Sequence, residues 1–276
     1  MLRWVLETNH LLTIIAVLLS IHTSTVNITT GRNQLAILPE SDLQYMASQE
    51  YREFLKINEV LSPLNNDQAL MVQRVGARLS EAVSDYYQIQ NLKNETKGYK
   101  WEFNLVDSPD ANAWCLPGGK VIVYTGLLNI TQSESELAVV MGHEIAHAIA
   151  KHGNERMSRA LIANGIGIVG SIVTSVDRQM NTVFESVYWP CSEIHFLLPN
   201  SRRQELEADK IGLVFITLAG YDPGDAVALW EKMKMTSAGG PPEFLSTHPT
   251  EESRIKELQR FMPNTLNYFK AVDRRK

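Results

Sequence analysis

The sequence is poor in cysteine and has no excess of positive charge. Only two cysteines occur in 276 residues, Cys115 and Cys191, and their separation excludes a CxxC metal or redox motif. They are interpreted either as a pair formed in an oxidising compartment or as two separate buried side chains. Lysine and arginine number 26 against 31 acidic residues, which leaves no surplus of cations for nucleic-acid phosphates. Nucleic-acid binding is therefore not expected.

Long charge-free apolar runs are also scarce. The run Leu11 to Ile21 (LLTIIAVLLSI) is shorter than the roughly 20 residues that a membrane-spanning helix requires. Its length is typical of a signal-peptide core, but Glu7 offsets Arg3 in front of it and the cleavage pattern is poor. Residues 1–25 are therefore predicted to be a signal peptide or an N-terminal membrane anchor, in an exported, periplasmic or membrane-associated protein. No cysteine follows the run, so a lipid-anchored lipoprotein is not supported.

The remaining chain has the composition of a folded globular protein, with 44% hydrophobic and 21% charged residues. Apolar residues at helical spacing between Ser41 and Tyr87 predict one or two helices. Alternating patterns then predict strands over Trp101–Val106, Ala113–Cys115 and Lys120–Tyr124. The predicted fold class is α+β and mainly helical, with a helical region 26–95 packed on a core domain 96–276. The small sheet is expected to present an edge strand just before the next helix.

That next helix carries the main motif. It is predicted to begin at Thr131 or Ser133, each followed three positions later by a glutamate, and to end near His152 with Gly153 as its stop. Its stretch from Leu137 to Ala150 is apolar on nearly every face. The exceptions are His143, Glu144 and His147. Because buried polar groups without partners are costly, these three side chains indicate a bound metal.

His143, Glu144 and His147 form an HExxH sequence. Histidines four positions apart share one helical face, so one ion can bridge both imidazoles. Glu144 projects about 100° away, close enough to act as a general base on water at the metal without ligating it. The motif predicts one catalytic Zn2+ per chain.

A catalytic zinc needs a third protein ligand and one open position. The metzincin pattern is excluded because Ala150 and Gly153 stand where it needs glycine and histidine. A second helix, beginning at Ser201, offers a carboxylate instead: Glu205, Asp209 and Gly212 share one face of it. Glu205 is the candidate ligand, Asp209 the candidate partner for the second nitrogen of a bound histidine, and Gly212 would allow the two helices to approach closely. Glu207 points away and is interpreted as a solvated or structural carboxylate.

Other candidates are less specific. His248 lies in a Thr-His-Pro turn and is interpreted as an oxyanion donor, as a reversible fourth ligand, or as a turn histidine with a packing role. His152 and His195 are interpreted as structural. The strand through Asn112, Ala113 and Trp114 is expected to pair with an extended peptide substrate.

One apolar segment lies between the candidate ligands. Ala160 to Val176 has no charged residue, but a single membrane crossing there would place the ligands of one ion on opposite sides of a layer of roughly 30 Å. A buried or surface-dipping helix is expected instead. The stretch that follows, to Pro199, is interpreted as a mobile lid or as a poorly packed insertion.

The sequence resembles a family of membrane-associated zinc endopeptidases that includes the HtpX, prenyl-protein-protease, Oma and BepA types. The resemblance covers about Trp101 to Phe261. It rests on four motifs, NAWCLPGGKVIVYTGLL (Asn112–Leu128), HEIAHAIAKH (His143–His152), SRRQELEADKIG (Ser201–Gly212) and STHPTEESRI (Ser246–Ile255). It implies a gluzincin-type fold with Glu205 as third zinc ligand and Glu144 as catalytic glutamate. Many exported members carry an acylated cysteine that this chain lacks.

The resemblance also implies cleavage of misfolded or membrane-associated proteins in quality control, at a membrane surface. The mitochondrial inner membrane is the alternative location. Two other functions stay open from the residues: a zinc-bound chaperone-like protein that holds unfolded chains, and a metallohydrolase that acts on a bond other than a peptide. The presence of Glu144 argues against the chaperone, because a structural zinc needs a fourth ligand and no base.

Overall fold

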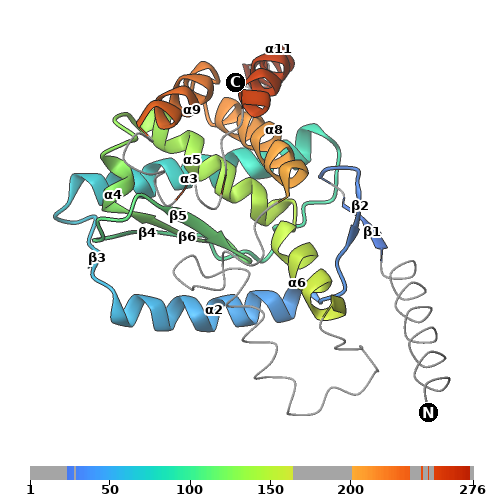
Figure 1. Ribbon diagram of the computed structural model, residues 1–276, viewed down its shortest axis with the longest axis horizontal. Coiled ribbons are helices and arrows are strands. Elements are labelled where there is room, and N and C mark those ends of the chain that lie inside the picture. Colours follow the sequence, from blue (N-terminus) through green and yellow to red (C-terminus); the bar gives the residue numbers. More distant parts are fainter. Residues whose placement is uncertain are drawn as a thin grey trace, which may run out of the picture.

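A four-stranded sheet lies between helix α2 (Glu40–Ile57) on one side and the helices of the candidate site on the other (Figure 1). The structure is a computed structural model that describes residues 24–27, 29–163, 201–236, 244, 248 and 252–273. The described helices after α2 are α3 (Asp67–Ile89), α4 (Thr125–Leu128), α5 (Glu134–Ile149), α6 (His152–Ala163), α8 (Arg202–Leu218), α9 (Gly224–Thr236) and α11 (Glu252–Asp273).

The sheet is mixed. Its strands are β3 (Val60–Leu61), β4 (Glu102–Val106), β5 (Ala113–Leu116) and β6 (Lys120–Tyr124), arranged in the order β3-β4-β6-β5. β4 and β6 are parallel, whereas β3 and β5 pair antiparallel with β4 and β6 respectively. β5 is therefore an edge strand and precedes α5, so the predicted α+β architecture is confirmed. A separate antiparallel hairpin consists of β1 (Ser24–Val26) and β2 (Asn33–Leu35).

Side chains alternate between the two faces of the sheet. Leu105, Val121 and Val123 point into the large core that contains α3, α5 and α8. Val106 and Ile122, one position along, point into a second core with α2 and α6. This period of two follows from the pleat of a strand. Both faces of the sheet are covered, and α5 is therefore held against it from one side (Figure 1).

Helix α5 is shorter than the sequence predicted. Ser133 caps its start, and the Ser133 side chain accepts a hydrogen bond from the Glu136 backbone N–H at 3.1 Å. Its end is at Ile149, because Lys151 takes a left-handed φ of 56° and breaks the helix. Gly153, predicted as the stop, lies instead inside α6, whose first residue is His152. The chain therefore turns at Lys151, between the end of α5 and His152 at the start of α6.

Helices α5 and α8 cross with their backbones in contact. A Cβ atom built on Gly212 of α8 would lie 3.1 Å from the carbonyl carbon and oxygen of Gly142 and from the backbone nitrogen of His143. On the other side, a Cβ on Gly142 would lie 2.8 Å from Cγ2 of Ile216. The expected role of Gly212 is thus confirmed, since a side chain at either glycine would push the two helices apart.

Several expectations fall on residues outside the described ranges. They are the leader up to residue 23, most of the apolar segment after Ala163, the proposed lid, His195 and Cys191. Cys115 is buried, and its pairing with Cys191 stays untested. Among the described helices, none combines the length and the apolar character needed to cross a bilayer.

Substitution of Gly212 by valine tests the helix contact. We expect the free energy of unfolding to fall by about 1–3 kcal/mol, because the new methyl groups overpack against buried backbone that has no room to move. Urea unfolding monitored by circular dichroism measures the change. Lys210→Val introduces the same side chain on a half-exposed position of α8 and should cost less than about 1 kcal/mol. Equal losses in the two variants would contradict a special role for the glycine contact.

Candidate metal centre

Four buried side chains from three parts of the chain converge on one point. They are His143 and His147 of α5, Glu205 of α8 and His248, and one ligand atom of each lies within 4.8 Å of the others. Nε2 of His147 lies 3.0 Å from Nε2 of His143, and the two Glu205 oxygens lie 3.4 Å from these nitrogens. Nδ1 of His248 completes the group at 3.1 Å from both Glu205 oxygens and 3.3 Å from Nε2 of His143.

These separations fit a single metal ion. Zinc binds histidine nitrogen and carboxylate oxygen at about 2 Å in a tetrahedron, which places neighbouring donor atoms about 3.3 Å apart. The observed separations of 3.0 to 3.4 Å agree. The structure therefore brings together His143, His147 and Glu205, the three predicted ligands, and it adds His248 as a fourth donor.

The charge state of the cluster also favours the binding of a cation. Burial lowers the pKa of both imidazoles, but the nearby Asp209 and Glu205 carboxylates outweigh it at His143 and raise that pKa to about 9. At His147, burial dominates and the pKa lies well below its ordinary value. Burial alone would raise the pKa of Glu205, yet the neighbouring His248 and His147 hold it well below its usual range. Metal binding at His143 would displace the proton that its raised pKa favours.

Glu144 lies beside the cluster with an unsatisfied oxygen. Its Oε1 atom is buried, has no hydrogen-bond partner within the described part of the chain, and lies 3.4 Å from Nε2 of His248. Burial raises its pKa above the ordinary value, while His248 and His143 pull the pKa down. A carboxylate with a raised pKa and a free acceptor is suited to take a proton from a water molecule at the centre.

Asp209 and Arg254 support the ligands from behind. Oδ1 of Asp209 lies 3.1 Å from Nδ1 of His143, in the predicted position for orienting this imidazole. Arg254 of α11 donates from Nε and Nη2 to the two Asp209 oxygens at 2.8 and 2.7 Å, and its Nη1 lies 3.0 Å from Oε2 of Glu205. The same Nη1 donates to the His248 carbonyl at 3.2 Å. The Arg254 guanidinium thus contacts both carboxylates and the backbone of His248.

Arg254 was missed by sequence reasoning, although it lies in the STHPTEESRI motif. Its position four residues after Thr250, in the first turn of the largely polar helix α11, gave no indication of its partners. The guanidinium also packs over the Trp230 ring at 4.7 Å, which fixes it between α9 and α8.

The predicted substrate strand lies at the sheet edge. Asn112, Ala113 and Trp114 are all buried. The Asn112 Oδ1 atom accepts a hydrogen bond from the Ala113 N–H, while Asn112 Nδ2 has no partner within the described residues. Ala111, the residue before, accepts a hydrogen bond from the Phe244 N–H at 3.1 Å, and Phe244 stacks on His248 with ring centroids 4.8 Å apart. The edge strand β5 and His248 are thus connected through Ala111 and Phe244.

His152 and Glu207 lie closer to the centre than their interpretation as structural residues suggested. His152 is fully buried, and its Nδ1 lies 2.9 Å from Nδ1 of His147. Its Nε2 lies 3.1 Å from Oε2 of Glu207. The sequence indicated this contact only through the position of His152 five residues after His147. The break at Lys151 then brings the His152 ring beside the His147 ring.

An HExxH helix with a carboxylate from a second helix is the metal centre of a zincin-type metallopeptidase. Comparison with known families agrees: the model of Peptidase family M48 matches residues 70–262, and the chain belongs to this family. The resemblance noted from the motifs is thereby confirmed.

Individual relatives are similar over stretches of 164 to 246 residues. The mitochondrial metalloendopeptidase OMA1 of Saccharomyces cerevisiae is 32% identical over 225 residues, which cover 78% of this chain and 61% of the relative. Human OMA1 is 30% identical over 246 residues, covering 86% and 45%. The beta-barrel assembly-enhancing protease of Escherichia coli is 28% identical over 164 residues, covering 58% and 34%. The chain thus spans from 34% to 61% of the length of these relatives.

Removal of Glu205 tests the ligand set. We expect Glu205→Ala and the isosteric Glu205→Gln to lose bound zinc, because the remaining donors no longer include the anion that offsets the charge of the ion. Elemental analysis of the purified proteins measures the metal content per chain. Glu257→Ala removes a carboxylate on the surface of α11 and should retain a full complement. Retention of zinc by both Glu205 variants would identify another residue as the third ligand.

Proposed function

We propose that this protein is a zinc-dependent endopeptidase in which His143, His147 and Glu205 hold the ion and Glu144 is the general base. The observation that carries the proposal is the Oε1 atom of Glu144, which has no hydrogen-bond partner among the described residues and is buried beside a cluster whose donor atoms have tetrahedral spacing. A structural zinc site has no use for such a carboxylate. A hydrolytic site requires one.

The mechanism follows from these positions. His143, His147 and Glu205 would hold the ion as two neutral imidazoles and one carboxylate, and a bound zinc ion would then supply about one net positive charge to acidify an adjacent water and polarise a peptide carbonyl. Glu144 accepts a proton from this water while the oxygen of the water forms a bond to the carbonyl carbon. As the carbon–nitrogen bond breaks, Glu144 returns the proton to the leaving amine. Asp209 keeps the His143 ring oriented, and Arg254 keeps Asp209 ionised.

The substrate is proposed to bind as an extended strand along β5. Pairing at a sheet edge uses main-chain groups and carries little sequence preference, so unfolded polypeptides are the favoured class. Asn112, beside β5, supports this location, because its Nδ2 atom is a donor without a hydrogen-bond partner among the described residues, and such donors normally have an acceptor. The names of the relatives, a mitochondrial metalloendopeptidase and a protease that enhances β-barrel assembly, support membrane-associated or envelope proteins as substrates. They support a membrane-associated location in either a bacterial envelope or a mitochondrion.

His248 is proposed to be a reversible fourth ligand. With four protein donors the tetrahedron is complete, as in structural zinc sites, whereas catalysis needs one open position. The Nδ1 atom of His248 lies at ligand spacing from Glu205, while its Nε2 faces Glu144 at 3.4 Å. Withdrawal of this side chain would free one coordination position and the space in front of the base. The same four-donor arrangement is the observation that favours the second candidate, a zinc-bound chaperone-like protein that holds unfolded chains.

Substitution of Glu144 by glutamine separates the two functions. We expect Glu144→Gln to retain zinc and to lose at least about 100-fold in the rate of casein digestion, since the amide cannot accept the proton. Rates of peptide release and zinc content are measured on the same preparations. Glu257→Gln on α11 is the control and should keep the wild-type rate. Equal rates for wild type and Glu144→Gln would defeat the catalytic assignment.

Substitution of His248 by alanine tests the fourth position. We expect His248→Ala to keep its zinc, because three donors remain, and to change the rate of casein digestion. An increase identifies His248 as a ligand that closes the site, and a decrease identifies it as a donor to the substrate oxyanion. Zinc content and rate are compared with those of the wild type. Loss of zinc would show that His248 is an obligatory ligand and would contradict both roles.

A further inference from the structure

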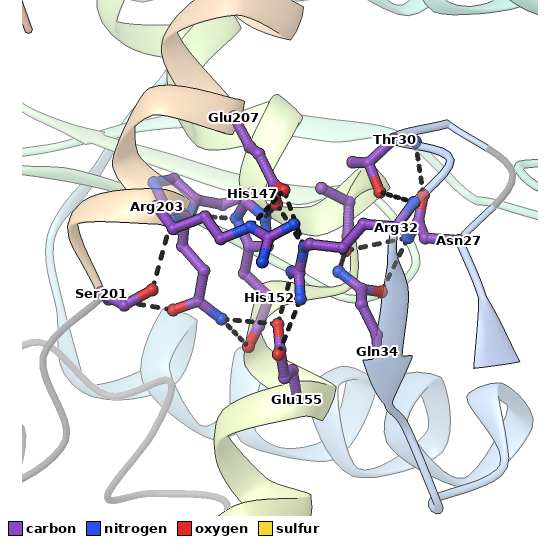
Figure 2. Close-up of polar contacts among 12 residues, drawn as sticks. Asn27, Thr30, Arg32, Gln34, His147, His152, Glu155, Ser201, Arg203 and Glu207 are labelled. Atoms are coloured by element: carbon purple, nitrogen blue, oxygen red, sulfur yellow. Dashed lines mark hydrogen bonds and ion pairs between the residues drawn. The ribbon is translucent and has the colours of Figure 1, made fainter. Parts of the chain in front are cut away.

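The second ring nitrogen of His147 has an unusual partner. Nε2 of His147 faces the metal centre, 3.0 Å from Nε2 of His143, whereas Nδ1 faces away and lies 2.9 Å from Nδ1 of His152 (Figure 2). His143 differs, because its own Nδ1 lies 3.1 Å from a carboxylate, that of Asp209. Metal-bound histidines need a partner at the second nitrogen to fix the ring and its tautomer. For His147 that partner is another imidazole.

The hydrogen positions in this contact follow from the ligand role of His147. If Nε2 binds the ion, then Nδ1 of His147 carries the hydrogen and donates it to Nδ1 of His152. Nδ1 of His152 must then be the acceptor, so its hydrogen is on Nε2. That nitrogen lies 3.1 Å from Oε2 of Glu207 and donates to it. His147 thus donates a hydrogen bond to His152, and His152 donates one to the Glu207 carboxylate.

Arg32 holds that carboxylate in place. Its Nε atom donates to both oxygens of Glu207, at 2.7 and 3.1 Å. Its Nη1 and Nη2 atoms donate to Glu155 of α6 at 2.9 and 2.6 Å. The Arg32 side chain is only 8% exposed and that of Glu155 2%, so these charge pairs are screened little by water. Gln204 of α8 adds a hydrogen bond to Glu155 at 3.0 Å.

The hairpin that supplies Arg32 is also fastened to the end of α5. The side-chain amides of Asn27 and Gln34 both donate to the carbonyl of Ala150, at 3.0 and 2.8 Å. This carbonyl belongs to the C-terminal turn of the HExxH helix, where carbonyl groups have no partner inside the helix. The β1–β2 hairpin thus contacts the metal-binding helix at its end and the ligand His147 through two intervening side chains (Figure 2).

We propose that His152, Glu207 and Arg32 form a positioning relay for His147, so that the β1–β2 hairpin is a working part of the metal centre. The relay keeps Nε2 of His147 turned toward the ion and sets its tautomer. None of its three members touches the ion or the substrate, so they are positioning residues. Arg32 lies outside residues 70–262, the range that the family model matches, so the support of the site extends beyond that range. The proposal rests on the proposed zinc site and deepens it.

The test measures zinc affinity by competition with a chelator. We expect His152→Ala to weaken zinc binding about 10- to 100-fold, the usual loss when the partner of a ligand is removed. Glu207→Gln, which keeps the shape of the side chain and leaves Arg32 paired with Glu155, should weaken zinc binding in the same direction. His152→Gln keeps one acceptor and one donor and should recover most of the loss. The visible spectrum of the cobalt-loaded proteins reports the geometry of the ligands and should change in His152→Ala.

Arg32 and Arg203 both contact the Glu207 carboxylate, so Arg203 provides a matched control for Arg32. Arg203 also reaches Oε1 of Glu207, but at 3.5 Å and with its side chain 69% exposed. Arg203→Gln should leave zinc affinity within about threefold of the wild type, because exposed pairs contribute little. Arg32→Gln should weaken it by more than the control. Circular dichroism identifies any variant that fails to fold, and Glu207→Gln then decides, since it removes no volume.

Wild-type affinity and an unchanged cobalt spectrum in folded His152→Ala or Glu207→Gln would overturn the relay. So would equal effects of Arg32→Gln and Arg203→Gln. The proposed peptidase activity fails separately, if the wild-type protein binds zinc but digests casein no faster than Glu144→Gln. The relay is then still decided by the affinity measurements, which do not depend on hydrolysis.

Discussion

The contact between Gly142 of α5 and Gly212 of α8 is the constraint on which the rest of the centre depends. A zinc ion, the proposed metal, would bind its ligands at about 2 Å and tolerate little displacement, so the Glu205 carboxylate would have to lie beside two imidazoles on another helix. A Cβ atom at Gly212 would meet buried backbone at 3.1 Å, which only glycine avoids. The sheet and α9 pack against α5, and α3 and α11 pack against α8, which keeps the two helices in this contact (Figure 1).

The centre concentrates charge among buried side chains. Glu144, Glu205 and Asp209 are each at most 5% exposed, and an isolated carboxylate in such surroundings would be neutralised by a proton. Against this effect of burial, Arg254 lowers the pKa of Asp209, while His248 and His147 hold the pKa of Glu205 below its usual range. For Glu144, burial outweighs the nearby positive charges and raises the pKa. Two of the three acids therefore favour the ionised form, and the third favours uptake of a proton, as the proposed base requires.

The two imidazoles of the HExxH pair are supported in different ways. His143 rests on Asp209, which comes from the same helix as Glu205, so ligand and support move together. His147 rests on His152, Glu207 and Arg32, which come from three separate elements. The break at Lys151 makes this possible, because it turns the chain so that His152 faces back toward His147. The metal-binding helix is consequently held at its end by the N-terminal hairpin as well as along its length by α8.

Much of this arrangement was determined by local sequence. The spacing of His143 and His147 places both on one face of any helix, and the Ser133 and Ser201 caps set where α5 and α8 begin, because these effects act within four residues. The strands over residues 102–124 followed from alternation in the same way. The structure places Glu205 and Asp209 beside His143, as their spacing with Gly212 along a single helical face predicted, while their roles as ligand and ligand partner stay predictions.

Tertiary structure alone decided what lies between distant elements. No spacing rule connects Arg254 with Asp209, or Arg32 with Glu207, since such pairs are separated by 45 and 175 residues and meet only after the chain folds. The end of α5 was misplaced because glycine, here Gly153, is the more common helix stop. The left-handed turn at Lys151 instead follows the carbonyl of Ala150, which accepts hydrogen bonds from the side-chain amides of Asn27 and Gln34 in the hairpin. The sequence by itself therefore determined which residues can bind the ion. The folded chain determined which side chains orient those ligands, because orientation depends on contacts that the order of residues along the chain does not contain.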